Sequence, residues 1–302
     1  MSLTIAPEID LESLAAVVEH RSLQEEFEPW QGRVAAACED PFHPAELTWI
    51  ARDQGAPVAF ALAYVLPSTP GRFAQVRIGV IDSHRRLGLG SQLLDTAVAA
   101  LHAGAPDCRE ISLVAWVPNV AAERFAARHG FAHARSFWLM ERPRGHVPDT
   151  TMPPSIELRA FDGSEAALRD LNDAYNASFA QHYHFVRTTV DDTRALVTRA
   201  GFRRDALALA YRGGHCVGFC RNELFANRGE IAVLGTVPEA RRIGLGRALL
   251  RWGVAWLEIH DAPRITLLVD GDNEQALVLY LSEEFHVART RVVWAKPGPG
   301  RS

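Results

Sequence analysis

The sequence is poor in three features that would each assign a protein to a class. Its 302 residues include four cysteines, too few for a disulfide scaffold. The longest apolar run, residues 58–66, has nine residues, which is about half of what a membrane-spanning helix needs and indicates a buried strand. The formal net charge is −4, so no excess of basic charge supports nucleic-acid binding. We therefore expect no membrane span and no nucleic-acid partner.

The cysteines and the amino-terminal segment give no indication of a metal site or of export. Cys216 and Cys220 are spaced to point to one side of a strand, where burial explains them. Cys38, His43 and Cys108 do not supply a second ligand group, so we predict no metal. The first twenty residues lack the basic and apolar regions of a secretory signal. These observations predict a cytoplasmic protein.

The chain contains one internal repeat. The segment RRLGLG at 85–90 returns as RRIGLG at 241–246, an offset of 156 residues (241 minus 85). Further landmarks keep the same order, from Gly79 and Gly235 to Phe131 and Phe285. Proline-rich residues 142–155 lie between the copies. We predict a first domain at 1–143, a linker at 144–154 and a second domain at 155–302.

Hydrophobic periodicity gives both copies one order of elements. In the second copy it predicts a strand, two helices and three antiparallel strands, followed by the glycine-rich turn. A long helix at 245–259, a strand at 265–269, a helix at about 273–282 and a closing strand follow the turn. The predicted class is mixed α/β (α+β): two tandem folds, each a mixed, mostly antiparallel sheet flanked by helices.

In both copies a strand runs directly into the R-R-x-G-L-G turn, and a helix begins at its glycines. Glycines allow close approach to a phosphate, and the first amides of a helix are free to bind an anion. Arg241 and Arg242 add positive charge at this turn. The motif lacks the Lys-Ser/Thr ending of a P-loop, and three strands precede it, unlike a Rossmann unit. A diphosphate group fits these donors.

These residues resemble the GNAT superfamily of acetyl-CoA-dependent acetyltransferases, whose motif is R/Q-x-x-G-x-G/A. The resemblance implies that the strand before the turn binds the pantetheine arm of acetyl-CoA and that the turn holds its diphosphate. The cofactor-binding residues implied in the second copy are Leu234, Gly235, Thr236, Arg241, Arg242, Ile243, Gly244, Leu245, Gly246, Arg247 and Asn273. In the first copy they are Ile78, Gly79, Val80, Arg85, Arg86, Gly88, Leu89, Gly90 and Ser91. Glu284 replaces the usual glycine before Phe285, which leaves the turn geometry there open.

Two differences between the copies favour the second as the catalytic one. Acetyl transfer to an amine needs a base for the ammonium proton and an acid for the leaving thiolate. Glu230 precedes the second turn, and its counterpart is Ala74; Tyr280 lies seven residues after Asn273, and its counterpart is Ala126. Tyr280 is the predicted acid, although an aromatic core residue has the same pattern. Glu230 is the predicted base, and a solvated strand-end residue is an equal alternative.

The acceptor is less well defined by sequence. His182, Tyr183 and His184 follow the first helix of the second copy, where the superfamily forms its acceptor wall, and we expect them to line the substrate pocket. Asp191 and Asp192 are expected to cap the next helix. The predicted reaction is N-acetylation of a small primary amine. The strand before the second turn also resembles that of mycothiol synthases, which implies a cysteinyl pseudodisaccharide as an alternative acceptor.

A non-catalytic acyl-CoA-binding or sensor protein is the alternative from another class, because binding does not require the acid and base. The first copy could bind a coenzyme A ester without turnover, or it could serve only as a scaffold. A tandem pair can satisfy within one chain the pairing that single-domain relatives meet by dimerising, so a monomer is favoured.

Overall fold

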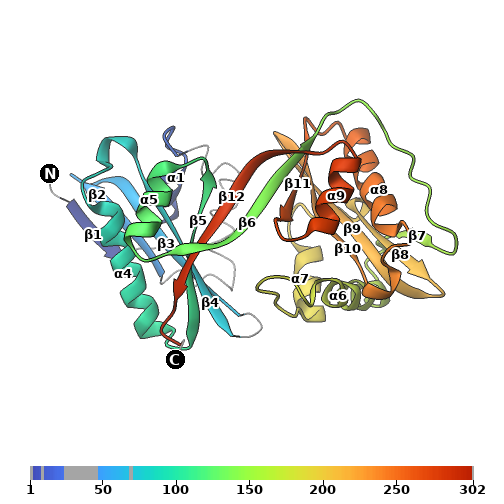
Figure 1. Ribbon diagram of the computed structural model, residues 1–302, viewed down its shortest axis with the longest axis horizontal. Helices are drawn as coiled ribbons and strands as arrows, with labels where there is room; N and C mark the ends of the chain where they lie inside the picture. Colours follow the sequence, from blue (N-terminus) through green and yellow to red (C-terminus); the bar gives the residue numbers. More distant parts are fainter. Residues whose placement is uncertain (1–2, 8–9, 24–46, 68–70, 301–302) are drawn as a thin grey trace. The chain divides into compact units, whose positions relative to one another are not determined.

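The computed structural model describes residues 3–7, 10–23, 47–67 and 71–300, and by contacts it divides into two units (Figure 1). Unit 1 comprises residues 1–135 and 291–302, and unit 2 comprises residues 136–290. Cys38 and His43 lie outside the described residues. No helix of the described chain is long and apolar enough to cross a membrane.

Unit 1 is a mixed sheet with helices packed on it. Its strands follow the order β1-β2-β3-β4-β5-β12, in which β4 and β5 are parallel and the pairs from β1 to β4 are antiparallel. The elements are β1 (Leu3–Pro7), α1 (Leu11–Val18), β2 (Thr48–Asp53), β3 (Ala56–Leu66), β4 (Arg72–Val80), α4 (Leu89–Gly104), β5 (Cys108–Val117), α5 (Val120–Arg128) and, from Arg291 onward, β12 (His286–Pro297).

Unit 2 repeats this plan in the order β6-β11-β10-β9-β8-β7, with β10 and β11 parallel. Its elements are β6 (Ala132–Arg142), β7 (Glu157–Ala160), α6 (Glu165–Phe179), α7 (Val190–Thr198), β8 (Leu207–Arg212), β9 (His215–Phe225), β10 (Arg228–Thr236), α8 (Leu245–Ile259), β11 (Ile265–Asp270) and α9 (Glu274–Ser282). The predicted mixed sheet flanked by helices is confirmed.

The two halves of the sequence exchange their last strands. Strand β6 ends the first half, but from Ser136 it belongs to unit 2, where it pairs antiparallel with β11. Strand β12 ends the second half, but from Arg291 it belongs to unit 1, where it follows β5 in the sheet. The units defined by contacts thus meet at residues 135/136 and 290/291, whereas the sequence predicted a single linker at 144–154. A local pattern of alternating residues specifies a strand, whereas its partner is chosen by non-local packing.

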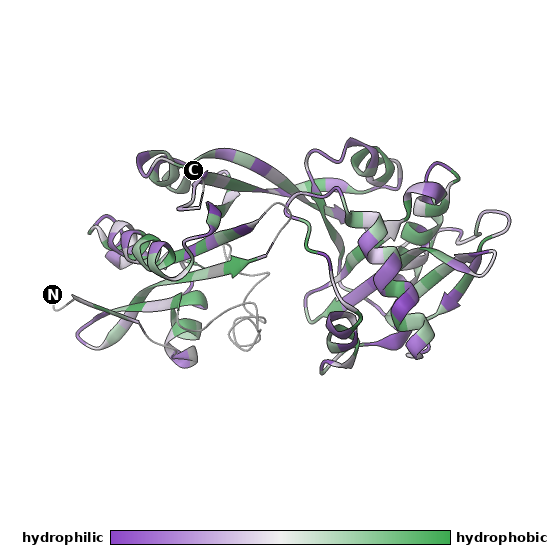
Figure 2. Ribbon diagram, turned by 90° about the horizontal axis from the view of Figure 1, so that it is seen from below, coloured by the Kyte–Doolittle hydropathy of each residue, from purple (hydrophilic) through white to green (hydrophobic). Residues whose placement is uncertain are grey.

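Helices α6 and α8 cover opposite faces of the unit 2 sheet. A Cβ at Gly235 would lie 3.1 Å from Ser178 of α6, whereas a Cβ at Gly229 would lie 2.6 Å from Leu257 of α8. Leu249 and Leu250 of α8 are fully buried in the core, each contributing roughly 2 kcal/mol of apolar burial. In Figure 2 the helices carry both hydrophobic and hydrophilic colours, as expected for elements with one buried side. We call the two sides of this sheet the α6 face and the α8 face.

Candidate functional site

Both glycine-rich turns have one backbone geometry. Arg242 and Gly244 have φ values of +64° and +84°, and the matching Arg86 and Gly88 have +62° and +85°. In each copy a helix begins at the next residue, α4 at Leu89 and α8 at Leu245. The first amide of α8 with an intrahelical acceptor is that of Ala248, which donates to the Gly244 carbonyl. The preceding amides of this first turn therefore remain available to an anion. The residues present fit the diphosphate of coenzyme A.

The first arginine of each turn braces the turn. The Arg241 guanidinium donates to the carbonyl oxygens of Thr236 (3.4 Å) and Ser178 (3.1 Å). In unit 1, Arg85 donates to the equivalent carbonyls of Val80 and Ser22, both at 3.0 Å. Sequence reasoning expected these arginines to wrap phosphates, but it could not foresee that they tie the strand, the turn and the first helix together.

The two asparagines of the repeat are helix caps. Asn273 Oδ1 accepts from the Ala276 amide (3.1 Å) at the start of α9, and Asn119 Oδ1 accepts from the Ala122 amide (3.0 Å) at the start of α5. Each cap satisfies a helix amide that lacks an intrahelical partner. The capping bond uses Oδ1 and leaves Nδ2 of Asn273 as the group that could donate to the coenzyme.

Strands β10 and β11 separate beyond Glu230. They form only the pairs Gly229–Ile265 and Glu230–Thr266, so the rest of β10 up to Thr236 has no partner on the β11 side. In unit 1, β4 and β5 pair over five residues, from Arg72 to Val76. The unpaired edge of β10 offers backbone donors and acceptors of the kind that an extended amide chain such as pantetheine can bind.

A β-bulge in β10 changes which residues share a face. Ile231 pairs with Asn222 and Val233 with Arg221, so Ala232 is the extra residue. Side chains alternate along a strand, and one extra residue brings Glu230 to the same face as Gly235. Strand β4 has no such shift against β3, which leaves Ala74 and Gly79 on opposite faces. Glu230 and Gly235 thus share a face of the sheet in unit 2, whereas Ala74 and Gly79 do not share one in unit 1.

Glu230 lies among charged residues on the α6 face. Its Oε2 is 3.3 Å from Arg228 Nη2, and the Arg228 guanidinium lies 4.1 Å from the centre of the Phe225 ring. Glu223 of β9 lies directly opposite Glu230 and forms ion pairs with Arg199 and Arg221. Neutralisation of Glu223 by two arginines reduces its repulsion of Glu230, so both carboxylates can occupy neighbouring positions.

Tyr280 is half-buried in α9, with its ring 6.1 Å from that of Phe285. Burial, together with the nearby thiol of Cys220, raises the pKa of Tyr280. The hydroxyl therefore keeps its proton at neutral pH, as a proton donor must. Ala126 at the matching place in unit 1 is fully buried and has no proton to donate.

The segment after α6 brings together the three residues expected at the acceptor pocket. His182 packs edge-on against Phe179 with ring centres 4.6 Å apart, and Tyr183 contacts His184 at 3.9 Å. His182 is exposed, whereas Tyr183 and His184 are half-buried. Within the described residues there is no group of three or more metal-ligating side chains. The segment is a partly exposed group of aromatic and imidazole side chains that follows α6.

Glu284 adopts the backbone conformation of the glycine that it replaces. Its φ is +68°, close to the +77° of Gly130 at the matching place in unit 1. Oε2 of Glu284 forms an ion pair with Nη2 of Arg142 at 2.7 Å, and the Arg142 side chain is 3% exposed. The turn that the sequence left open therefore keeps the left-handed geometry.

Comparison with known proteins defines the family. The model of the acetyltransferase (GNAT) family matches residues 12–131 and 167–285, and the chain belongs to this family. It is an acetyltransferase of the acetyl-CoA-using type with two GNAT domains. Among its relatives is a mycothiol acetyltransferase from Frankia alni, 34% identical over 236 residues that span 70% of this chain and 67% of the relative. Another, from Kineococcus radiotolerans, is 35% identical over 225 residues that span 73% and 71%.

Solved structures share the tandem fold. A GCN5-related N-acetyltransferase from Sphaerobacter thermophilus superposes with a TM-score of 0.75 at 20% identity, covering 98% of this chain and 95% of that one. A tandem GNAT protein from the clavulanic acid biosynthesis pathway gives 0.71 at 15% identity, covering 98% of both chains. These structures support the tandem fold and carry no information on the acceptor.

Proposed function

We propose that the chain transfers an acetyl group from acetyl-CoA to a primary amine of a small molecule, and that the second copy performs this reaction. The observation that carries the proposal is the bulge at Ala232, which aligns Glu230 with Gly235 on the α6 face. In unit 1 the matching strand β4 has no register shift against β3, and the two matching positions hold Ala74 and Ala126. Both backbone geometry and residue identity therefore favour unit 2.

Each residue has a distinct role in this proposal. The acetyl thioester supplies an electrophilic carbonyl carbon and a thiolate leaving group. Amides of the turn at 242–247 bind the diphosphate, and the free edge of β10 at Leu234–Thr236 binds the pantetheine arm. Glu230 takes the proton of the acceptor ammonium, so that the amine nitrogen can attack the acetyl carbon; the second proton that this nitrogen loses as the amide forms restores the hydroxyl of Tyr280. Tyr280 gives its proton to the departing sulfur, and His182, Tyr183 and His184 contact the acceptor.

A cysteinyl pseudodisaccharide is the second candidate for the acceptor. The named relatives are mycothiol acetyltransferases at 34% and 35% identity, which is the observation that favours it. The proposal includes a monomeric cytoplasmic chain. Unit 1 retains the turn geometry at Arg86 and Gly88, so binding of a coenzyme A ester without turnover is one role for it, and a scaffold without ligand is the other.

The test is release of free thiol from acetyl-CoA with a panel of small amines that includes the cysteinyl pseudodisaccharide. We expect Glu230→Gln and Tyr280→Phe each to lower kcat by about 100-fold, with the dissociation constant of acetyl-CoA unchanged within about twofold. Calorimetric titration counts the coenzyme sites, for which we expect one or two. Binding of acetyl-CoA without turnover of any amine would favour the sensor alternative.

A further inference from the structure

Two buried asparagines of α6 hold the segment that follows this helix. Asn172 and Asn176 are 5% and 7% exposed. Asn176 binds both backbone groups of Thr188: its Oδ1 accepts from the Thr188 amide (2.9 Å), and its Nδ2 donates to the Thr188 carbonyl (2.9 Å). A second bond from Nδ2 reaches Asn172 Oδ1 (3.2 Å). The amide side chain of Asn176 thus pairs with the backbone of Thr188 as a neighbouring strand would.

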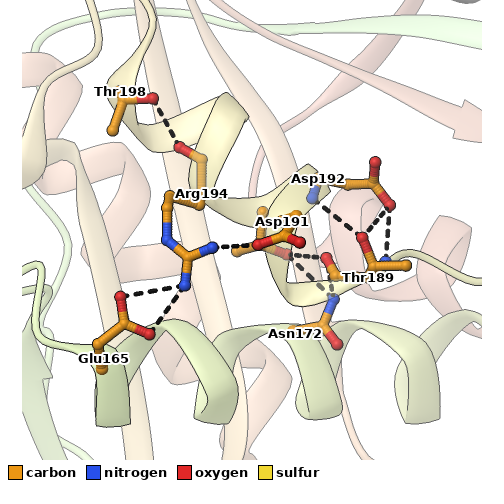
Figure 3. Close-up of polar contacts among 8 residues, drawn as sticks. Glu165, Asn172, Thr189, Asp191, Asp192, Arg194 and Thr198 are labelled. Atoms are coloured by element: carbon orange, nitrogen blue, oxygen red, sulfur yellow. Dashed lines mark hydrogen bonds and ion pairs between the residues drawn. The ribbon is translucent and has the colours of Figure 1, made fainter.

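Asn172 extends this attachment to the start of α7. Its Nδ2 lies 2.9 Å from the Thr189 carbonyl and 3.0 Å from Thr193 Oγ1. Thr189 caps α7 and shares a reciprocal capping box with Asp192 (Figure 3). The segment between the two helices, residues 181–189, is therefore fixed at its carboxyl end by a connected polar network.

The residue that follows α7 pairs with the cross-strand neighbour of the predicted base. Arg199, which follows α7, forms an ion pair with Glu223, and Glu223 lies opposite Glu230 on the α6 face. The start of residues 181–189 is also ordered, because the His182 amide donates to Phe179 (2.8 Å) and the Phe185 amide to His182 (3.1 Å). The segment and α7 thus lie on the side of the sheet that carries Glu230.

We propose that Asn172 and Asn176 are positioning residues that hold residues 181–189 as a preformed wall of the acceptor site and thereby set acceptor selectivity. This inference rests on the proposed function. Moving the segment would break the bonds from both buried amides to Thr188 and Thr189, and the bond between Asn172 and Asn176 alone cannot satisfy their polar groups. A wall fixed in this way favours an acceptor that fits His182, Tyr183 and His184 in one arrangement and discriminates against amines that do not contact them.

Hydrogen exchange of the full-length chain tests the positioning without any acceptor. We expect Asn176→Leu to speed exchange at the Thr188 and Phe185 amides by at least about tenfold, while amides of α8 keep their rates. Asn172→Ala leaves both bonds between Asn176 and Thr188, and should give a smaller increase. Glu165→Gln is the matched control, because it removes only an exposed ion pair between α6 and Arg194 (2.8 Å).

Acceptor selectivity provides the second readout. We expect Asn176→Leu to lower kcat/KM for the cysteinyl pseudodisaccharide at least about tenfold more than for ethylamine, with acetyl-CoA affinity within about twofold of wild type. Unchanged exchange at residues 182–188, or faster exchange spread over all of unit 2, would overturn the inference. Equal losses for both amines would also overturn it. If the wild type turns over no amine, the proposed function fails, and exchange together with acetyl-CoA affinity still decides whether the asparagines position the segment.

Discussion

Glu284 has the left-handed backbone conformation that Gly130 has in the first half, with φ values of +68° and +77°. A side chain in this conformation costs about 1 kcal/mol relative to glycine. The ion pair with the buried Arg142 at 2.7 Å offsets this cost in the wild type.

Comparison of two substitutions separates these effects. Glu284→Ala removes the ion pair and keeps the strain, whereas Glu284→Gly removes both. We expect the glycine variant to be more stable than the alanine variant by about 1 kcal/mol in urea denaturation. Equal stabilities would mean that the turn relaxes away from the left-handed conformation.

Gly246→Ala should separate coenzyme binding from stability. A Cβ at Gly246 would lie 3.7 Å from Leu279 and 4.0 Å from Thr236, so the free protein has room for it. Alanine in a helix gains about 1 kcal/mol over glycine, so the melting temperature should not fall. The added methyl group would occupy space beside the proposed diphosphate site, and we expect acetyl-CoA affinity to fall at least about tenfold. Gly90→Ala is the matched variant in unit 1, and calorimetry with both variants assigns each site to a copy.

Replacement of Arg241 should affect the stability of the protein, whereas replacement of Arg242 should affect acetyl-CoA binding. Arg241→Met loses two hydrogen bonds to carbonyl oxygens and should destabilise the protein by about 1–3 kcal/mol. Replacement of the exposed Arg242 by Met should leave the free energy of unfolding unchanged within about 0.5 kcal/mol, while acetyl-CoA binding becomes less sensitive to salt. Thermal unfolding and binding at two salt concentrations measure both effects. A stability loss at Arg242 equal to that at Arg241 would contradict the bracing role.

The stability of an isolated second domain should depend on whether the fragment includes β6. A fragment of residues 144–302 lacks β6, which contributes Met140 with no exposed surface and Arg142, the buried partner of Glu258 at 3.5 Å. Loss of these contacts removes several kcal/mol. A fragment of residues 136–290 keeps them, and we expect it to melt at least about 10 °C higher in a thermal scan. A higher melting temperature for residues 144–302 would show that β6 is dispensable.

Elements defined by local chemistry were predictable from the sequence. The bounds of α8 agree with the predicted 245–259, because the glycine turn and the hydrophobic period mark this helix locally. The exchange of β6 and β12 was not predictable, since their pairing depends on distant parts of the chain.

The candidate site was predictable in its residue types and less so in its geometry. The contrast of Glu230 with Ala74 is visible in sequence, but the bulge at Ala232 appears only in the register of β9 and β10. Asn172 and Asn176 were missed, although their spacing of four residues beside apolar positions of α6 is the signal of a buried polar pair. Their partners lie in a segment without periodicity, which no local pattern could have identified.

The exchange of terminal strands gives a physical reason for a chain to keep its first repeat whether or not that repeat is catalytic. Deleting the first repeat from the gene would also delete residues 136–142, the strand that covers the β11 side of the unit 2 sheet. Selection for a stable second sheet therefore retains the first repeat whichever copy performs catalysis, and Ala74 and Ala126 can persist in it. The two repeats can differ in activity, although neither can be deleted without removing a strand from the sheet of the other unit.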